Sequence, residues 1–317
     1  GSLWAWGSNA YGQLGNGNFT SSTVPVLVGN GFQQAAAAKY FSVALKTDGS
    51  LWTWGHNEVG SLGNGTRTTC SITATTLCPD EAFSGARQPA QIATGYSAIS
   101  ANSGAFHVLA LKPVGSLWAW GLGESGQIGN NSTLNALAPV QVGSGFTTIS
   151  AGRSSSFAIK TDGTLWSFGM GVFGQLGVGV VPRKAVPVQV LSGVTGIAAG
   201  FRHTMALKAD GSLWTWGEND KGQLGDGTTV QRSTPVQVLT GVAAVGAGFQ
   251  HSMAIKTDGT LWVWGNNANG AVGDGSRIDR VTPVQVLSNV VAVAAGKQTL
   301  ALRSDGSVWA WGSNSNG

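Results

Sequence analysis

The chain has 317 residues, of which 42% are hydrophobic and 10% are charged, with 18 Lys or Arg against 14 Asp or Glu. Globular domains usually carry about 25% charged residues, so this low charge, together with 49 glycines, argues against long surface helices. No apolar run is long enough to predict a membrane-spanning helix. The net charge of +4 is spread along the chain instead of clustered, which argues against a nucleic-acid-binding protein.

A unit of 48 residues recurs along almost the whole chain. The phrase Gly-Ser/Thr-Leu/Val-Trp-x-Trp/Phe-Gly begins at Gly1, Gly49, Gly115, Gly163, Gly211, Gly259 and Gly306, at steps of 48, 66, 48, 48, 48 and 47 residues. A fixed period of roughly 20 to 50 residues indicates a repeat architecture. We therefore expect one domain over 1–317, with copies at 1–48, 49–114, 115–162, 163–210, 211–258 and 259–305 and a partial copy at 306–317.

The copy that starts at Val194 shows the elements expected of every copy. Short apolar runs bounded by Gly, Asp and Pro predict strands at 196–200, 203–208, 212–217 and 234–238, with a Gly- and Asn-rich loop before the last. The Asp210-Gly211 pair between the second and third runs predicts a hairpin with a type I′ turn. Asp48, Asp162, Asp258 and Asp305 recur at this position, which Val114 occupies in the second copy. Each copy thus predicts four short antiparallel strands and no helix.

The paired tryptophans predict how the sheets pack. Residues two apart on a strand point to the same face, so each Trp-x-Trp strand carries two indoles on one face and smaller apolar residues on the other. The pairs are Trp4 and Trp6, Trp52 and Trp54, Trp118 and Trp120, Trp214 and Trp216, Trp262 and Trp264, and Trp309 and Trp311. Both faces of each sheet therefore need cover, and stacking bulky faces on small faces predicts a β-propeller.

The stretch HTMALKADGSLWTWGENDKGQLGDGTT, followed by TPVQV, resembles the regulator of chromosome condensation repeat family. Six copies cover practically the whole chain, and the low charge resembles the bacterial secreted branch. The resemblance implies a propeller of the seven-bladed type with four-stranded antiparallel blades. The last blade is expected to be incomplete, because the seventh copy stops at Gly317, and the natural protein is expected to continue past that residue. A six-bladed ring with one redundant strand is the alternative.

Several apparent motifs coincide with repeat positions. Gly-x-Gly-x-x-Gly occurs at 121–126 and 169–174, but both align with the loop at 217–222 and open no helix, so no nucleotide or other cofactor is expected. His107, His203 and His251 share one position with Phe41, Ser155 and Gln298, and are expected to bond to local backbone and not to a metal. His56 stands alone in a loop, and no catalytic constellation emerges from the spacing.

Two sets of charged residues also recur once per copy. Lys46, Lys112, Lys160, Lys208, Lys256 and Arg303 each precede, except in the second copy, an Asp two residues later, so the two sets are expected largely to neutralise each other. Asp226 and Asp274 align with Asn16, Asn64, Asn130 and Val178. A valine at this position favours turn chemistry over a calcium site, which needs six to eight oxygen ligands.

The copies differ most just after the Ala-Gly step of each copy. These residues are expected at one rim of the propeller, and aromatic and Arg side chains dominate the energetics of protein interfaces. The resemblance to secreted β-lactamase-inhibitor propellers implies that such a rim grips a partner protein. The candidate partner-binding residues are Lys39, Tyr40, Phe106, Arg153, Phe201, Arg202, Phe249, Gln250 and Lys297. Capping of the blade ends is the alternative role.

The second candidate is the insert 66–88 in the second copy, because insertions in propellers map to loops that often bind partners. It carries Arg67, Arg87, Asp80 and Glu81 together with Cys70 and Cys78, the only two cysteines. Two cysteines this close in a loop favour a disulfide over a metal site, and a disulfide implies an oxidising compartment. In the Ran exchange factor of the family an inserted element acts, but this insert does not resemble that one.

The sequence predicts a non-catalytic, extracellular or cell-surface module that binds another protein through the rim, the 66–88 insert, or both. It is expected to bind no nucleic acid, to insert in no membrane and to need no cofactor. A carbohydrate- or surface-polymer-binding module is one alternative, since rim aromatics would serve it. A guanine-nucleotide exchange factor for a small GTPase is the other.

Overall fold

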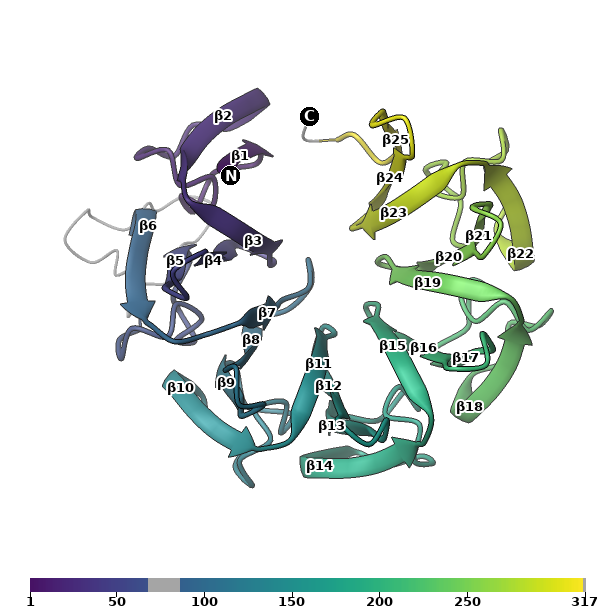
Figure 1. Cartoon of the computed structure of the whole chain (residues 1–317), viewed down its shortest axis with the longest axis horizontal. Coiled ribbons are helices and arrows are strands. Elements are labelled where there is room, and N and C mark those ends of the chain that lie inside the picture. Colours follow the sequence, from purple (N-terminus) through teal and green to yellow (C-terminus); the bar gives the residue numbers. More distant parts are fainter. Residues whose placement is uncertain (68–85, 316–317) are drawn as a thin grey trace. The chain divides into compact units, whose positions relative to one another are not determined.

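The computed structural model describes residues 1–67 and 86–315, and these residues fold into short antiparallel β-strands (Figure 1). The chain divides into two compact units, which we call unit 1 (Gly1–Ser154 with Ser315) and unit 2 (Ser155–Asn314). Within the described residues, no helix is both long and apolar enough to cross a membrane.

Unit 1 contains the first eleven strands. They are β1 (Ser2–Gly7), β2 (Ser22–Asn30), β3 (Phe32–Ala37), β4 (Phe41–Lys46), β5 (Leu51–Gly55), β6 (Ala86–Ala93), β7 (Ala98–Ser100), β8 (His107–Leu111), β9 (Leu117–Gly121), β10 (Ala136–Gly143) and β11 (Phe146–Ala151). Strands β3 to β6 form one four-stranded sheet and β7 to β10 another, whereas β1 pairs with β2 in a separate two-stranded sheet.

Unit 2 contains the remaining strands. They are β12 (Ser155–Lys160), β13 (Leu165–Met170), β14 (Arg183–Leu191), β15 (Val194–Ala199), β16 (His203–Lys208), β17 (Leu213–Gly217), β18 (Arg232–Leu239), β19 (Val242–Ala247), β20 (His251–Lys256), β21 (Leu261–Gly265), β22 (Arg280–Leu287), β23 (Val290–Ala295), β24 (Gln298–Arg303) and β25 (Val308–Gly312). Strands β15 to β18 and β19 to β22 form four-stranded sheets in chain order, and β23 to β25 form a three-stranded sheet.

The blade β15 to β18 confirms the predicted strands and shows the register of a copy. His203 lies opposite Gly217 and Leu207 opposite Leu213, so β16 and β17 form a regular hairpin. The pairing of β17 with β18 shifts register between Leu213 and Trp214. Each strand is only a few residues long, and the alternating side chains supply both faces of the sheet.

The predicted hairpins are confirmed, but the predicted turn type is wrong. Gly211 N donates to Lys208 O, and Lys208 N donates to Ser212 O, so the turn closes before the strands resume. Gly211 has a φ of 79°, whereas among the described residues other than glycine only Asn131 and Asn289 have positive φ. A type I′ turn needs positive φ at both central residues. Here only Gly211 is left-handed. This fits a three-residue hairpin loop, Ala209 to Gly211, in which a type I turn is followed by a glycine in the left-handed region that forms a β-bulge.

The prediction of a seven-bladed type is wrong, because the described strands form six blades of three or four strands beside the two-stranded sheet. The prediction counted Trp-x-Trp/Phe strands, of which there are seven. A blade also needs the hairpin partner that precedes this strand, and β1 pairs with β2 alone. Its tryptophans reflect this incomplete environment: Trp4 is 50% exposed and Trp6 is 52% exposed, against 2% for Trp54.

A loop of one blade is fastened to the next blade by a pair of hydrogen bonds to one carbonyl. In unit 2, Gln223 O in the loop after β17 accepts from Ser252 Oγ at 2.7 Å and from Trp264 Nε1 at 3.0 Å. The same pair of bonds joins Gln175 O to Thr204 and Trp216. In unit 1, Gln13 O accepts from Ser42 and Trp54. We call this arrangement the interblade latch.

In four of the pairs the second tryptophan therefore lies in the core between neighbouring blades: Trp54, Trp120, Trp216 and Trp264. Trp264 is fully buried and packs in one cluster with Met205 and Leu213 of the preceding blade. Trp216 packs in the same way against Phe157 and Leu165. Burial of an indole is among the largest single apolar contributions a side chain can make. The stacking of bulky faces on neighbouring sheets follows the prediction from the Trp pairs.

Two of the aligned histidines strengthen the latch, so the prediction that they bond to local backbone is wrong. His203 Nε2 lies 2.9 Å from Ser252 Oγ, and His251 Nε2 lies 2.9 Å from Thr299 Oγ1. The Ser252 hydroxyl already donates its proton to Gln223 O. The neutral His203 ring must then carry its proton on Nε2 and donate to Ser252. Each of these histidines thereby connects two blades of unit 2.

We predict that Gly225→Ala destabilises the protein more than Gly241→Ala. Both glycines have positive φ, at 77° and 68°, so both variants incur backbone strain of about 1 kcal/mol. A Cβ at Gly225 would lie 2.6 Å from Trp264 Nε1, whereas nothing lies within 4 Å of one at Gly241. We expect Gly225→Ala to cost about 2 kcal/mol more, measured by urea unfolding with tryptophan fluorescence. Equal losses would contradict a structural role for the close approach.

We also predict that stability falls as the pH drops below 6.5. Burial lowers the pKa of His107 and His251 to about 4, and burial with the nearby His251 lowers the pKa of His203 to about 3. The unfolded chain therefore binds protons that the folded chain does not, at a cost of about 1 kcal/mol per histidine between pH 6 and pH 5.

Urea unfolding at several pH values measures this loss, with His203→Gln as the control because Gln298 occupies the equivalent position. The variant should remove about a third of the slope. An unfolding free energy that is constant between pH 6 and pH 5 would contradict the prediction.

Candidate functional site

In unit 1 the structure brings three of the predicted binding residues together. Tyr40 precedes β4 and Phe106 precedes β8, and their ring centroids are 5.9 Å apart. Lys39 Nζ lies 5.0 Å from the centroid of the Tyr40 ring and 4.8 Å from that of Phe106. Tyr11, from the loop after β1, stacks on Tyr40 at 4.5 Å. With His56, which contacts both tyrosines, these residues form what we call the Tyr40 cluster.

In the Tyr40 cluster the pKa values of His56 and Tyr11 are shifted in the direction that favours the neutral form of each side chain. His56 is buried, with its ring edge-on to Tyr11 and its Nε2 3.6 Å from Glu58 Oε2. Burial lowers the pKa of His56; Glu58 opposes this effect and Lys39 adds to it. Burial also raises the pKa of Tyr11, as do Tyr40 and Glu58. His56 therefore does not stand alone, and near neutral pH it is an uncharged part of an aromatic surface.

Unit 2 has a second cluster at the same repeat positions. Phe201 precedes β16 and Phe249 precedes β20, and their ring centroids are 3.9 Å apart. The Arg202 guanidinium lies 4.1 Å from the Phe173 ring and 5.3 Å from the Phe201 ring, and Lys297 Nζ lies 5.8 Å from the Phe249 ring. We call these five residues, with Glu218, the Phe201 cluster. Each of its two cations lies close to an aromatic ring, a favourable arrangement for both.

Two side-chain pairs accompany the Phe201 cluster. Arg202 Nη1 donates to Glu218 Oε1 at 3.0 Å, and Asn266 Nδ2 donates to Gln250 Oε1 at 3.2 Å. In both pairs the first residue after Trp-Gly meets the residue that precedes the second strand of the same blade. Arg153, the remaining predicted residue, follows β11 in unit 1 and is half-buried.

The sequence reasoning missed Tyr11, His56, Phe173 and Glu218. They occupy two further positions that vary between copies. One precedes the Gly-Gln-Leu-Gly loop and holds Tyr11, Val59, Ser125, Phe173, Lys221 and Asn269; the other follows Trp/Phe-Gly and holds Ser8, His56, Leu122, Met170, Glu218 and Asn266. Comparing every variable position of the repeat, and not only the one after Ala-Gly, could have found them.

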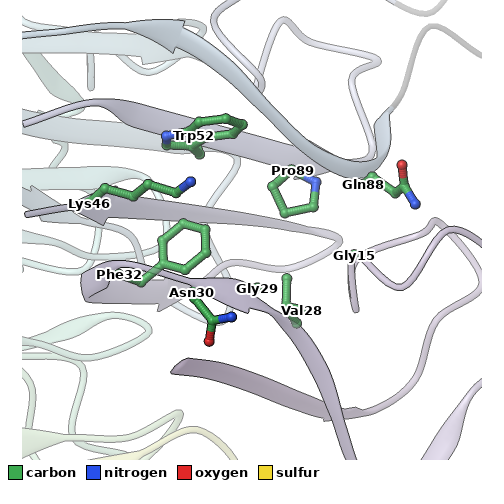
Figure 2. Close-up of a pocket in the computed structure, with 9 residues that line it drawn as sticks. All are labelled: Gly15, Val28, Gly29, Asn30, Phe32, Lys46, Trp52, Gln88 and Pro89. Atoms are coloured by element: carbon green, nitrogen blue, oxygen red, sulfur yellow. The ribbon is translucent and has the colours of Figure 1, made fainter. Parts of the chain in front are cut away.

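A cavity lies elsewhere in unit 1. It measures about 310 Å³ and is lined by Gly15, Val28, Gly29, Asn30, Phe32, Lys46, Trp52, Gln88 and Pro89 (Figure 2). Figure 2 shows the Lys46 side chain between two aromatic rings, with Nζ 4.1 Å from Trp52 and 5.1 Å from Phe32. Lys208 and Lys256 cover Trp214 and Trp262 in the same way. The arrangement is therefore a repeated structural feature and not a singular ligand site.

The recurring Asp and Lys residues, besides compensating each other's charge, each have a structural role at this position. The Asp210 carboxylate accepts from Ser212 N at 2.9 Å and from Ser212 Oγ at 2.6 Å, and the hydroxyl in turn accepts from Trp214 Nε1 at 3.0 Å. The hydrogen bonds from Ser212 are the main reason why the pKa of Asp210 is lowered. The aspartates thus shape the hairpin turn, and the lysines cover the first tryptophan of each pair.

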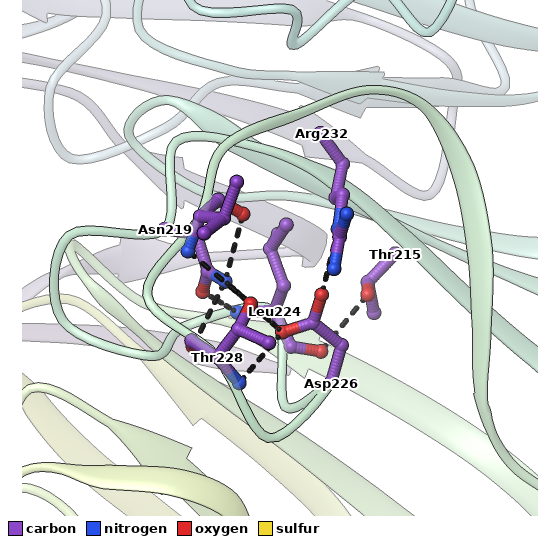
Figure 3. Close-up of polar contacts among 7 residues, drawn as sticks. Thr215, Asn219, Leu224, Asp226, Thr228 and Arg232 are labelled. Atoms are coloured by element: carbon purple, nitrogen blue, oxygen red, sulfur yellow. Dashed lines mark hydrogen bonds and ion pairs between the residues drawn. The ribbon is translucent and has the colours of Figure 1, made fainter.

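The loop that carries Asp226 is held by a closed polar network (Figure 3). Asp226 Oδ1 accepts from Asn219 Nδ2, Thr228 N and Thr228 Oγ1, and Oδ2 accepts from Arg232 Nε at 2.8 Å. Asn219 Oδ1 accepts from Leu224 N at 2.9 Å. Burial opposes ionisation of Asp226, but the bonds from Thr228 and Arg232 lower its pKa overall. Both carboxylate oxygens are engaged within the loop, which supports turn chemistry over calcium binding.

Residues 1–67 and 86–315 contain no group of three or more His, Cys, Asp or Glu side chains that could hold a metal ion. Cys70 and Cys78 lie outside the described residues, as does most of the insert 66–88, so the disulfide stays a prediction. At the described end of the insert, the Arg87 guanidinium lies 4.5 Å from the Phe19 ring.

Successive antiparallel blades joined by loops define an all-β protein of the β-propeller class. The family model of the RCC1-like domain matches residues 1–299, and that of the regulator of chromosome condensation (RCC1) repeat matches residues 290–317. The chain belongs to the RCC1-like family, which confirms the resemblance; its assignment to a bacterial secreted branch stays a prediction.

Solved structures show the same fold at low sequence identity. Human WBSCR16 is 21% identical with a TM-score of 0.78, over 92% of this chain and 78% of that one. Prp20p from Saccharomyces cerevisiae is 21% identical with a TM-score of 0.65, over 99% and 92%. The CRINKLY WD40 ectodomain of the Arabidopsis thaliana receptor kinase ACR4 is 15% identical with a TM-score of 0.51, over 89% and 79%.

Proposed function

We propose that this chain is a non-catalytic protein–protein interaction module that binds a partner through the Tyr40 cluster, the Phe201 cluster, or both. The observation that carries the proposal is that variable positions of the repeat meet in each unit as contacting aromatic and basic side chains. Tyr and Arg are enriched among the residues that dominate binding energy at interfaces, usually beside apolar neighbours that exclude water.

The packing of the clusters supports this use over a capping role alone. Tyr40, Phe106, Phe201 and Phe249 are half-buried, so part of each ring can meet a partner. The contacts with Lys39 and Arg202 already order the rings, which reduces the conformational entropy lost on binding. The cluster residues lie next to strands that the interblade latch holds against the neighbouring blade.

The relatives support the same class of function. The structure of Prp20p is described together with its binding to Gsp1p and histones, and another structure shows yeast RCC1 (Prp20) bound to Kap60. The shared fold thus serves protein binding in that relative. For this chain the partner is proposed to be another protein, with no nucleic acid and no cofactor involved.

We predict that alanine substitution in a cluster abolishes retention of the partner. The chain is immobilised and exposed to an extract of its source organism, with the variants Phe201→Ala with Phe249→Ala, and Tyr40→Ala with Phe106→Ala. Loss of a central aromatic contact should weaken binding about 30-fold, or about 2 kcal/mol. Lys208→Ala and Lys256→Ala are the controls, because these lysines lie at the opposite ends of β16 and β20.

Two outcomes would contradict the assignment. If both double variants retain the partner as the parent chain does, the clusters are not the binding surface. If deletion of 66–88 alone abolishes retention, the insert is the binding element. Thermal unfolding of each variant separates loss of binding from loss of fold.

We also propose an extracellular or cell-surface location, which rests on the spacing of Cys70 and Cys78 and on the low charge of the chain. A disulfide persists in oxidising compartments and is rare in reducing ones. The protein isolated from its source is treated with an alkylating agent before and after reduction. We expect Cys70 and Cys78 to become alkylated only after reduction. Free thiols before reduction would contradict this location.

A further inference from the structure

Most polar side chains around the Phe201 cluster are already paired within unit 2. Arg202 bonds to Glu218 at 3.0 Å, and Gln250 accepts from Asn266 at 3.2 Å. Lys221 lies 4.0 Å from Asp279. A partner gains little by competing for groups that satisfy each other, because it would have to break these contacts first. The paired groups therefore lie around the binding surface but do not determine which partner it binds.

Lys297 is the exception at this surface. It is exposed, it follows β23, and its ammonium group lies 5.8 Å from the centroid of the Phe249 ring. Within residues 1–67 and 86–315, no carboxylate lies within ion-pair distance of Lys297. The ring holds the cation near the aromatic surface while its charge stays available. A carboxylate from outside the chain would complete this arrangement.

The aromatic pair supplies the other half of the recognition chemistry. Phe201 and Phe249 stack at 3.9 Å and both are half-buried. An apolar or aromatic side chain packed on this pair would bury further apolar surface beside the Lys297 charge, at about 25 cal/mol for each Å² buried. The surface is therefore complementary to a carboxylate adjacent to an apolar side chain.

We propose that the Phe201 cluster binds an acidic peptide segment of a partner protein. An Asp or Glu of that segment pairs with Lys297, and a neighbouring aromatic or aliphatic side chain packs on Phe201 and Phe249. This inference rests on the proposed function and adds the chemistry of the partner.

The charge count disfavours the two other occupants. A single-stranded nucleic acid brings one phosphate with each base, and its binding grooves usually hold several cations. At this surface Arg202 is engaged by Glu218 and Lys221 lies near Asp279, which leaves Lys297. A basic segment would meet the Lys297 charge, and the carboxylate of Glu218 is already engaged by Arg202.

The test selects binders from a library of random short peptides displayed on phage, with the full chain as bait. Selected peptides should carry Asp or Glu next to an aromatic or large aliphatic residue. Their dissociation constants, measured by fluorescence anisotropy of labelled peptides, should rise about fivefold in Lys297→Gln and about tenfold in Phe249→Ala. Lys297→Glu should weaken binding further and Lys297→Arg should preserve it.

Lys256→Gln is the matched control, since it removes the same charge at the far end of β20 and should leave affinity unchanged. Peptides that require Phe249 but contain no acidic residue, or that bind Lys297→Glu normally, would overturn the inference and leave the proposed function standing. Failure to select any peptide that responds to Phe249→Ala would overturn it as well. Competition by a thymidine oligonucleotide would overturn it in favour of nucleic acid. The proposed function itself is tested by the capture experiment, where it fails if the double-alanine variants retain the partner or if deletion of 66–88 alone abolishes retention.

Discussion

The structure depends on a backbone carbonyl in the loop of a blade that accepts two hydrogen bonds from the next blade, at Gln13, Gln175, Gln223 and Ala271. Gln223 O accepts from the Ser252 hydroxyl and from the Trp264 indole N–H, and these two bonds engage both lone pairs and offset the cost of removing the carbonyl from water. Because the acceptor is main chain, the side chain at that position is free to change. Ala271 in unit 2 fills the same role through its own carbonyl.

The fact that the acceptor is backbone and the donors are recurring side chains explains why the candidate binding residues lie at only a few positions of the repeat. Hydroxyl, indole, glycine and hairpin aspartate all serve the joint between blades or the turn within one, so they recur in nearly every copy. The residues next to the interblade latch take part neither in the latch nor in the hairpin turn. They differ from copy to copy, and in each unit they build a cluster of its own composition: tyrosine, histidine and lysine around Tyr40, but phenylalanine with an arginine–glutamate pair around Phe201.

The repeat period predicted the strands, the hairpins and the stacking of indole faces, because those features depend on residues close together in one copy. The number of blades was mispredicted, since it depends on whether a Trp-x-Trp strand finds its hairpin partner in space, and β1 pairs with β2 alone. The predicted site lacked Phe173 and other cluster residues because their contacts also depend on the arrangement of the blades in space. Phe173 meets Arg202 across the boundary between two blades, and no pattern within a single strand reports that contact. The bond from His203 to Ser252 spans two blades in the same way and was mistaken for a local one.

The contact of Phe173 with Arg202 also bears on how such a protein changes over evolutionary time. Phe173 lies in the loop after β13 and Arg202 precedes β16, so the two belong to neighbouring blades, yet both fall within the sequence copy 163–210. Tyr11 and Tyr40 fall likewise within the copy 1–48. If a segment is exchanged or duplicated at the boundaries of a sequence copy, the contact between Phe173 and Arg202 moves with it. If the segment is cut at the boundaries of a blade, these two residues are separated. The contact of Phe201 with Phe249 joins two successive copies, so each cluster as a whole depends on which copies stand next to each other.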